Sequence, residues 1–317
     1  MMDASSAIFV AGHRGMVGSA IVRRLHSAGY ENLVLRTRSE LDLTDASATR
    51  EFFEEARPEY VFLAAAKVGG ILANDSCPAD FIRENLSIQT SVIHSAWESG
   101  VRKLLFLGSS CIYPKHAPQP MAEELLLTGP LETTNDAYAV AKIAGIKMCE
   151  AYRRQHGSSF ISAMPTNLYG PGDNFDEKGS HVLPGLIRRF DTAKKDGLES
   201  VTVWGSGTPR REFLHVDDLA DACLFLMLQY DGEGHVNVGV GEDISILGLA
   251  ELVKSVVGYR GEIRLDSTKP DGTPRKLLDV SLMESLGWSS RIGLRDGIET
   301  TYAWYTESDP ESIRSGS

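Results

Sequence analysis

The apolar positions in the first half of the chain follow two alternating periods. Short continuous apolar runs rich in β-branched and aromatic residues are typical of buried strands, whereas stretches with apolar residues three and four positions apart are typical of helices. The runs predict strands at 7–11, 33–35, 60–66, 103–107 and 159–164, and the spacing predicts helices at 16–25, 45–56, 79–99 and 137–156. Strands that alternate with helices indicate a parallel sheet covered on both faces. We therefore predict an α/β fold, a Rossmann-type doubly wound parallel sheet.

The pattern changes after Pro165. Glycine, proline and asparagine punctuate the next segment, and helices are predicted at about 181–195 and 217–229 with short strands and loops around them. We predict an NADP-binding Rossmann domain at 1–165, to which the chain returns at about 212–240. Residues 166–317 then form a smaller α/β substrate-binding domain that supplies the second wall of a cleft.

Composition and charge exclude several classes of protein. The 317 residues include 43 acidic and 32 basic side chains, a net charge of −11, which argues against a nucleic-acid partner. The longest apolar runs have seven residues, far fewer than the roughly 20 that span a membrane. We find neither a signal-peptide pattern nor a metal-binding spacing of cysteines, so we expect a cytoplasmic protein with reduced thiols and no metal.

A glycine turn follows the first predicted strand. Gly12, Gly15 and Gly18 form GxxGxxG in Gly12-His13-Arg14-Gly15-Met16-Val17-Gly18, directly before a predicted helix. Glycines there allow backbone to approach a pyrophosphate, whose charge the helix N-terminus favours. The context predicts a dinucleotide site rather than an ordinary turn.

The end of the second strand indicates which dinucleotide binds. A free 2′-hydroxyl usually meets an acidic residue about 20 positions after the glycines, but this chain has Arg36-Thr37-Arg38. Together with Arg14, these guanidiniums suit a 2′-phosphate and favour NADP. The alternative is a solvated basic strand end. Asp42, followed by Leu43, is expected to contact the adenine.

A tyrosine and a lysine share one face of the predicted helix at 137–156. Tyr138 and Lys142 are four residues apart, so the lysine is expected to lower the tyrosine pKa and make the phenol a general acid. Ser109 follows a buried strand at the edge where open α/β sheets bind ligands. It could donate a hydrogen bond to a substrate carbonyl.

With the glycine turn, these residues resemble the extended short-chain dehydrogenase/reductase family over nearly the whole chain. The resemblance implies that Ser109, Tyr138 and Lys142 form the catalytic triad and that Lys142 also holds the nicotinamide ribose. Further cofactor contacts implied by the resemblance are Leu107, Gly108, Ser109, Ser110, Pro165, Thr166, Asn167, Leu168 and His181.

Two other residues suggest chemistry beyond hydride transfer. On extended backbone, Cys111 points to the same side as Ser109, so its thiol is a candidate base whose pKa must be lowered by a neighbouring cation. His181 begins a helix after a glycine-rich loop. Taken alone, these positions favour other roles, Cys111 as a small buried hydrophobic residue and His181 as an ordinary helix-end residue.

Five longer stretches resemble one family of these reductases, the GDP-4-keto-6-deoxy-D-mannose 3,5-epimerase/4-reductases. They are SSCIYP at 109–114, AAKVGGI at 65–71, MPTNLYGP at 164–171, WGSGTPRREF at 204–213 and KPDGTPRK at 269–276. The resemblance implies NADPH-dependent conversion of that GDP-sugar to GDP-L-fucose, with Cys111 and His181 as base and acid of the epimerisations. It also implies that Arg189, Trp204, Arg211 and Asp271 bind the substrate.

Two alternative functions remain. One is a nucleotide-sugar 4-epimerase or 4,6-dehydratase that retains its cofactor. Relatives of the dehydratase kind carry an acidic pair where this chain has Ser110-Cys111. The other is a non-catalytic NADP sensor, which would not need Ser109, Tyr138 and Lys142. We further expect a homodimer formed through the helices at about 79–99 and 137–156.

Overall fold

The computed structural model describes residues 2–177, 179–269 and 271–308. Its largest sheet has six strands in the order β10-β5-β4-β3-β1-β2, and every pairing in it is parallel. The strands are β1 (Ile8–Ala11), β2 (Leu33–Val34), β3 (Tyr60–Leu63), β4 (Lys103–Leu107), β5 (Ser159–Pro165) and β10 (His235–Val238). The prediction of a doubly wound parallel α/β fold is confirmed.

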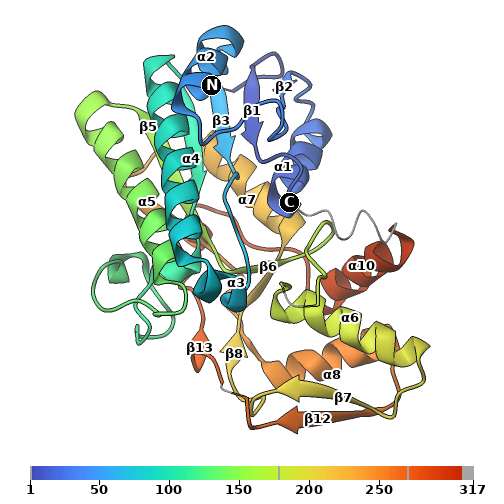
Figure 1. Cartoon of the computed structure of the whole chain (residues 1–317). Helices are drawn as coiled ribbons and strands as arrows, with labels where there is room; N and C mark the ends of the chain where they lie inside the picture. Colours follow the sequence, from blue (N-terminus) through green and yellow to red (C-terminus); the bar gives the residue numbers. More distant parts are fainter. Residues whose placement is uncertain (1, 178, 270, 309–317) are drawn as a thin grey trace.

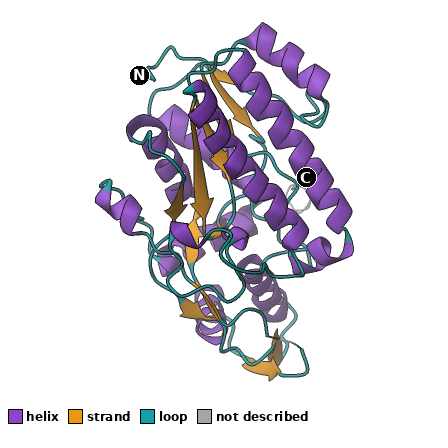
Figure 2. Cartoon of the chain, turned by 90° about the vertical axis from the view of Figure 1, so that its left-hand side faces the viewer, coloured by secondary structure: helices purple, strands orange, loops and turns teal. Residues whose placement is uncertain are grey.

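Helices cover both faces of this sheet (Figures 1 and 2). One face packs against α1 (Met16–Ser27) and α7 (Val216–Gln229), and the other against α2 (Ala46–Ala56), α4 (Pro78–Glu98) and α5 (Asp136–His156). Alternate strand residues therefore enter different cores. Ile8 and Val10 belong to the first core, whereas Phe9 belongs to the second.

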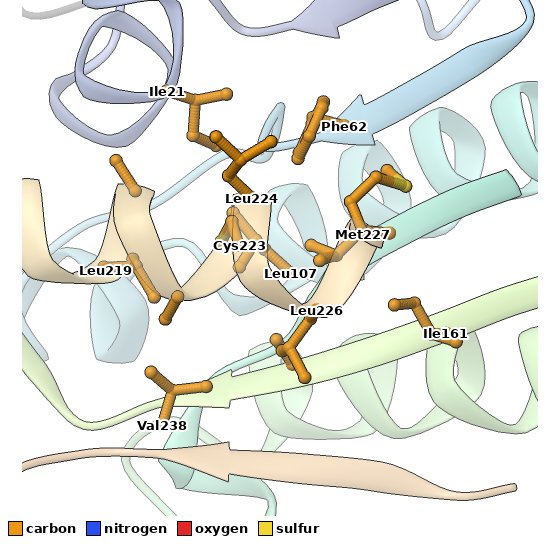
Figure 3. Packing of buried hydrophobic residues seen from close by; sticks show 14 of the residues in the cluster. Ile21, Phe62, Leu107, Ile161, Leu219, Cys223, Leu224, Leu226, Met227 and Val238 are labelled. Carbon is orange, nitrogen blue, oxygen red and sulfur yellow. The ribbon is translucent and has the colours of Figure 1, made fainter. Parts of the chain in front are cut away.

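Helix α7 shows how the later part of the chain stabilises this sheet. Figure 3 shows Cys223, Leu224 and Met227 of α7 packed among Ile21 of α1 and Phe62 of β3. The strand that follows α7, β10, pairs with β5 at the edge of the sheet.

A second layer of structure lies below the sheet in Figure 1. Its core joins α6 (Val182–Lys195), α8 (Ile246–Val257) and α10 (Leu294–Glu307) to β7 (Ser200–Trp204) and β12 (Glu262–Asp266), which pair in parallel. Short strands complete it: β6 (Asn167–Tyr169) with β9 (Phe213–His215), and β8 (Arg210–Arg211) between β11 (Ile244–Ser245) and β13 (Arg275–Lys276). Short helices are α3 (Ile71–Ser76) and α9 (Ser281–Ser285), with single 3₁₀ turns at Ser110–Ile112 and Glu123–Leu125.

The elements predicted for the first half are confirmed with small shifts at their ends, but the strand predicted at 60–66 ends at Leu63. Beyond it, Asn85 of α4 accepts a hydrogen bond from the Lys67 backbone N–H at 3.1 Å and donates one to the Lys67 carbonyl at 3.0 Å. These bonds hold the backbone of Lys67 in place of pairing with a neighbouring strand, so residues 64–70 form a loop. Among the described residues, no helix is long and apolar enough to cross a membrane.

Candidate active site

The glycine turn forms a tight backbone cradle at the start of α1. Gly12 has a φ of +83°, a conformation that favours glycine. A side-chain carbon at Gly18 would lie 2.1 Å from the Gly12 carbonyl oxygen, so only glycine lets the helix approach the turn this closely. Gly15 caps α1 without a side-chain hydrogen bond, and the first turn of the helix has no acidic residue. The free N–H groups of this helix end suit a pyrophosphate.

Each of the three arginines of the predicted phosphate site interacts with an acidic side chain. Arg14 and Arg36 both lower the pKa of the Glu40 carboxyl, although its hydrogen bonds from Thr37 lower it more. Arg36 also packs its guanidinium over the Phe52 ring at 5.6 Å. Arg38 instead reaches α4, where it pairs with Glu84 at 3.5 Å.

The structure also defines the contacts of Asp42, Leu43 and His13, which are predicted to bind the cofactor. Asp42 accepts hydrogen bonds from the N–H and the hydroxyl of Thr44, at 3.0 and 2.8 Å, which lower the carboxyl pKa. Leu43 packs against the core that contains α2 and α4. In the glycine turn, burial lowers the pKa of His13, whose Nδ1 is buried without a hydrogen-bond partner.

The catalytic candidates meet at the carboxyl end of β4. Ser109 has extended backbone, but Cys111 lies in the 3₁₀ turn that follows. The expectation that extended backbone aligns the two is therefore wrong, although the tight turn still leaves Ser109 close enough to bond both Cys111 and Tyr138. Lys142 donates to the Leu107 carbonyl at 2.8 Å, and its Nζ lies 5.7 Å from the centroid of the Tyr138 ring.

Burial dominates the ionisation of this cluster. It raises the pKa of Tyr138 well above its usual value, and the nearby Cys111 raises it further, whereas a hydrogen bond from Ser109 lowers it. The expectation that Lys142 lowers the Tyr138 pKa below its ordinary value is wrong, because the effect of burial is larger. Burial instead lowers the pKa of Lys142 to about 8.

Cys111 is buried, and burial raises its pKa. The Ser109 hydrogen bond and the charges of Lys276 and Lys142 act in the opposite direction. Lys276, whose charge acts on this thiol, lies on β13, far from Cys111 in the sequence. Its register partner on β8 is Arg211, so both side chains leave the same face of the small sheet.

Strand alternation divides the cations of the carboxyl-terminal part into two sets. Arg210 donates to Asp243 at 2.6 Å, and Arg275 pairs with the same carboxylate on the outer face. Arg211 and Lys276 face the other way, and burial lowers the pKa of both.

The remaining predicted substrate residues lie on or near α6 and β7 in the carboxyl-terminal part. Arg189 of α6 donates to the Thr202 carbonyl at 3.2 Å. The Trp204 side chain is 66% exposed, which excludes a core role, and Lys269 lies 5.6 Å from its ring centroid. Asp271 accepts hydrogen bonds from the Ser206 N–H at 2.9 Å and from its hydroxyl at 2.7 Å.

His181 is the N-cap residue of α6. The residue is exposed, yet desolvation by the surrounding protein lowers its pKa. The loop before it meets the loop that follows β3, because a side-chain carbon at Gly70 would lie 3.3 Å from the Gly179 carbonyl oxygen.

Two adjacent segments place the predicted nicotinamide contacts together. Gly108 and Ser110 follow Leu107 at the end of β4, and the Gly108 N–H donates to the Ala163 carbonyl of β5 at 2.9 Å. After Pro165 the Thr166 N–H donates to the Val238 carbonyl at 3.0 Å. The predicted contacts 165–168 thus continue from the strand beside β4, at the same sheet edge.

Glu212 anchors the second of these segments, and sequence reasoning missed it. The Asn167 side-chain nitrogen donates to the Glu212 carbonyl at 2.8 Å. The buried Glu212 carboxylate accepts from the N–H groups of Val240 at 2.6 Å, Gly241 at 2.8 Å and Leu278 at 2.9 Å. Its place inside the WGSGTPRREF stretch was the available signal.

Comparison with known proteins agrees with this geometry. Residues 8–239 match the NAD dependent epimerase/dehydratase family. The chain is 65% identical to a putative GDP-L-fucose synthase 2 from Arabidopsis thaliana, covering 97% of this chain and 94% of the relative. It is 55% identical to the GDP-L-fucose synthase of Escherichia coli K12, covering 95% and 96%. The chain belongs to the GDP-L-fucose synthase family.

A solved structure of a related enzyme has the same fold as this chain. A GDP-mannoheptose C4 reductase from Campylobacter jejuni with NADP bound superposes with a TM-score of 0.89 at 42% identity, covering 96% of this chain and all of that one. The predicted relationship to the GDP-L-fucose synthase family is confirmed. Among the described residues, no cluster of histidine, cysteine and carboxylate side chains could hold a metal.

Proposed function

We propose that this protein converts GDP-4-keto-6-deoxy-D-mannose to GDP-L-fucose, by epimerisation at C3 and C5 followed by reduction of the C4 ketone with NADPH. The convergence of Ser109, Cys111, Tyr138 and Lys142 at the end of β4 carries this proposal. It places a proton-donating phenol and a candidate carbon base at one point. A plain reductase needs only the first.

The chain's own residues fit NADP. The uncapped end of α1 would hold the pyrophosphate, Arg14, Arg36 and Arg38 the 2′-phosphate, and Lys142 the nicotinamide ribose. When bound, NADPH supplies hydride to the C4 carbon. The NADP-bound C4 reductase at 42% identity supports this choice of cofactor.

The epimerisations require a base and an acid. The C4 ketone acidifies the hydrogens on C3 and C5, so removal of a proton by Cys111 and return of a proton by His181 on the other face of the ring invert each centre. Lys276, Lys142 and the Ser109 hydroxyl favour the Cys111 thiolate. Ser109 and Tyr138 donate hydrogen bonds to the enolate oxygen.

The same donors then serve the reduction. Tyr138 delivers its proton to the C4 oxygen, and its raised pKa keeps that proton available at neutral pH. Ser109 orients the carbonyl. The Leu107 carbonyl holds the Lys142 ammonium beside the Tyr138 ring.

The carboxyl-terminal part would bind the nucleotide. Arg189 and Arg211 are assigned to the diphosphate, Trp204 to a sugar or base, and Asp271 to a ribose hydroxyl. We further propose that residues 1–165 form the cofactor domain and residues 166–317 the substrate domain, with the chain returning to the cofactor domain at 212–240. We also propose a cytoplasmic homodimer through α4 and α5, which sedimentation of the purified protein tests.

A turnover assay tests the proposed function. The protein is incubated with GDP-4-keto-6-deoxy-D-mannose and NADPH, and the product is compared with authentic GDP-L-fucose. We expect one NADPH oxidised for each GDP-L-fucose formed. Turnover without net NADPH oxidation would instead indicate a cofactor-retaining 4-epimerase or dehydratase. NADPH oxidation to a sugar unchanged at C3 and C5 would indicate a plain C4 reductase.

A further inference from the structure

Glu84 is a buried carboxylate with three cations around it, and one of them is Arg38 of the proposed 2′-phosphate site. Its carboxylate oxygens lie 2.6 Å from Lys67 Nζ, 3.5 Å from an Arg38 nitrogen and 3.9 Å from an Arg83 nitrogen. The hydrogen bond from Lys67 lowers the Glu84 pKa more than burial raises it. Glu84 is therefore charged at neutral pH.

The Arg38–Glu84 pair crosses the strand that carries the glycine turn. Arg38 follows β2, Glu84 lies on α4 after β3, and β1 runs between those two strands. The pair thus joins segments on either side of β1, the strand that ends at the glycine turn. The Arg38 side chain is 74% exposed, so its guanidinium is free to turn toward a ligand.

The loop after β3 does not depend on Glu84 for its shape. Asn85 bonds both the N–H and the carbonyl of Lys67. Removal of the Glu84 charge would leave this backbone fixed while freeing the Lys67 ammonium and the Arg38 guanidinium. The contribution of Glu84 at this place is consequently electrostatic.

We infer that Glu84 is a specificity-determining residue, a built-in counter-ion that competes with the adenosine 2′-phosphate for Arg38. The inference rests on the proposed use of NADP. Without cofactor, Glu84 holds Arg38 across β1. When the 2′-phosphate binds, Arg38 exchanges one anion for another, and Glu84 keeps its shorter pair with Lys67.

This exchange weakens binding of the phosphorylated cofactor and leaves binding of the unphosphorylated one unchanged. A reductase must release its spent cofactor after each turnover, whereas a cofactor-retaining epimerase need not. A competing carboxylate beside the phosphate site would therefore speed release.

Binding of 2′,5′-ADP and 5′-AMP to the full chain, measured by calorimetry, tests this inference. We expect Glu84→Gln to bind 2′,5′-ADP more tightly than wild type by up to about fivefold, the upper end of the range of a single partly exposed ion pair. Binding of 5′-AMP should not change. Asp80→Asn is the matched control, because Asp80 lies on the same helix 3.9 Å from Lys67 but has no ion pair with Arg38.

A double mutant assigns the effect to Arg38. In an Arg38→Met background, Glu84→Gln should lose most of its gain for 2′,5′-ADP. Equal or weaker binding of 2′,5′-ADP by Glu84→Gln, or the same gain in Asp80→Asn, would overturn the inference and leave the proposed function standing. If wild type itself fails to prefer 2′,5′-ADP over 5′-AMP, the NADP assignment falls as well.

Discussion

Lys142 on α5 donates a hydrogen bond to the carbonyl oxygen of Leu107, 2.8 Å away at the end of β4. The ammonium is buried, and burial lowers its pKa to about 8. Among the described residues this buried ammonium has one hydrogen-bond partner, so it costs stability, which is consistent with a group placed for function.

Lys142→Met should therefore stabilise the protein while abolishing reduction. We expect a gain of about 1 kcal/mol in the free energy of unfolding at pH 7, since loss of the buried charge outweighs one lost hydrogen bond. The folded pKa of about 8 lies below the ordinary value of 10.5, so the unfolded chain binds more protons between these values. Wild-type stability then rises with pH across that window, and the advantage of the variant shrinks.

Lys103→Met is the control for Lys142→Met. Lys103 is also buried with a pKa lowered by burial to about 8, but it donates to three carbonyls near the end of α7, those of Leu226, Met227 and Tyr230. Its removal should destabilise the fold, because three carbonyls lose a hydrogen bond and, within the described residues, only that of Leu226 keeps another donor, the Tyr230 N–H. Denaturant unfolding at pH 7 and pH 10 measures both variants, and a loss of stability in Lys142→Met would contradict the account.

Cys111→Ser should separate epimerisation from cofactor binding. The hydroxyl is far less acidic than the thiol, so exchange of the C3 and C5 hydrogens should slow by about 10²- to 10⁴-fold. Affinity for NADPH should stay near that of wild type. Cys77→Ser, at an exposed thiol, should leave both quantities unchanged. Normal exchange in Cys111→Ser, followed by NMR, would remove the thiol from the mechanism.

Gly18→Ala and Gly15→Ala should have different effects. A methyl group at Gly18 would lie 2.1 Å from the Gly12 carbonyl oxygen, so we expect a loss of about 2–4 kcal/mol of stability. At Gly15 the nearest atom would be 3.5 Å away, so folding should be kept. The account predicts that Gly15→Ala still weakens NADPH binding, because its methyl group enters the pyrophosphate approach. Thermal unfolding and cofactor titration of each variant measure the two effects.

Trp204→Ala should raise the KM for the GDP-sugar without changing stability. The side chain is 66% exposed, so little buried area is lost on truncation, and we expect Tm within about 2 °C of wild type. Loss of one aromatic contact should raise KM about tenfold. An unchanged KM would show that Trp204 is not part of the nucleotide site.

Features that depend on residues close together in the sequence could be predicted from the sequence alone. The glycine turn before α1, the strands β1, β3, β4 and β5 of a parallel sheet, and the shared face of Tyr138 and Lys142 all follow from local spacing and from the alternation of strands with helices. The same spacing led to a wrong pKa direction for Tyr138. Proximity to Lys142 was readable, whereas the burial that dominates the shift depends on the whole fold.

Residues contributed by distant segments could not be predicted from pattern. Lys276 reaches Cys111 only because β13 pairs with β8 in register with Arg211. Glu84 meets Arg38 because α4 and the end of β2 flank one strand. The sequence singled out Lys276 only as part of the KPDGTPRK stretch and did not single out Glu84 at all. The sequence also predicted no bounds for the short strands or for helices α8 and α10, because their mixed composition shows no clear period.

The central claim is that one site performs both proton transfer at carbon and reduction. Its most direct test is turnover of GDP-4-keto-6-deoxy-D-mannose with NADPH in heavy water, with NADPH oxidation followed by absorbance and deuterium at C3 and C5 read by NMR. The account predicts one solvent deuterium at each carbon of GDP-L-fucose for every NADPH oxidised. Oxidation of NADPH with no deuterium at either carbon would contradict it and reduce the site to a plain ketoreductase.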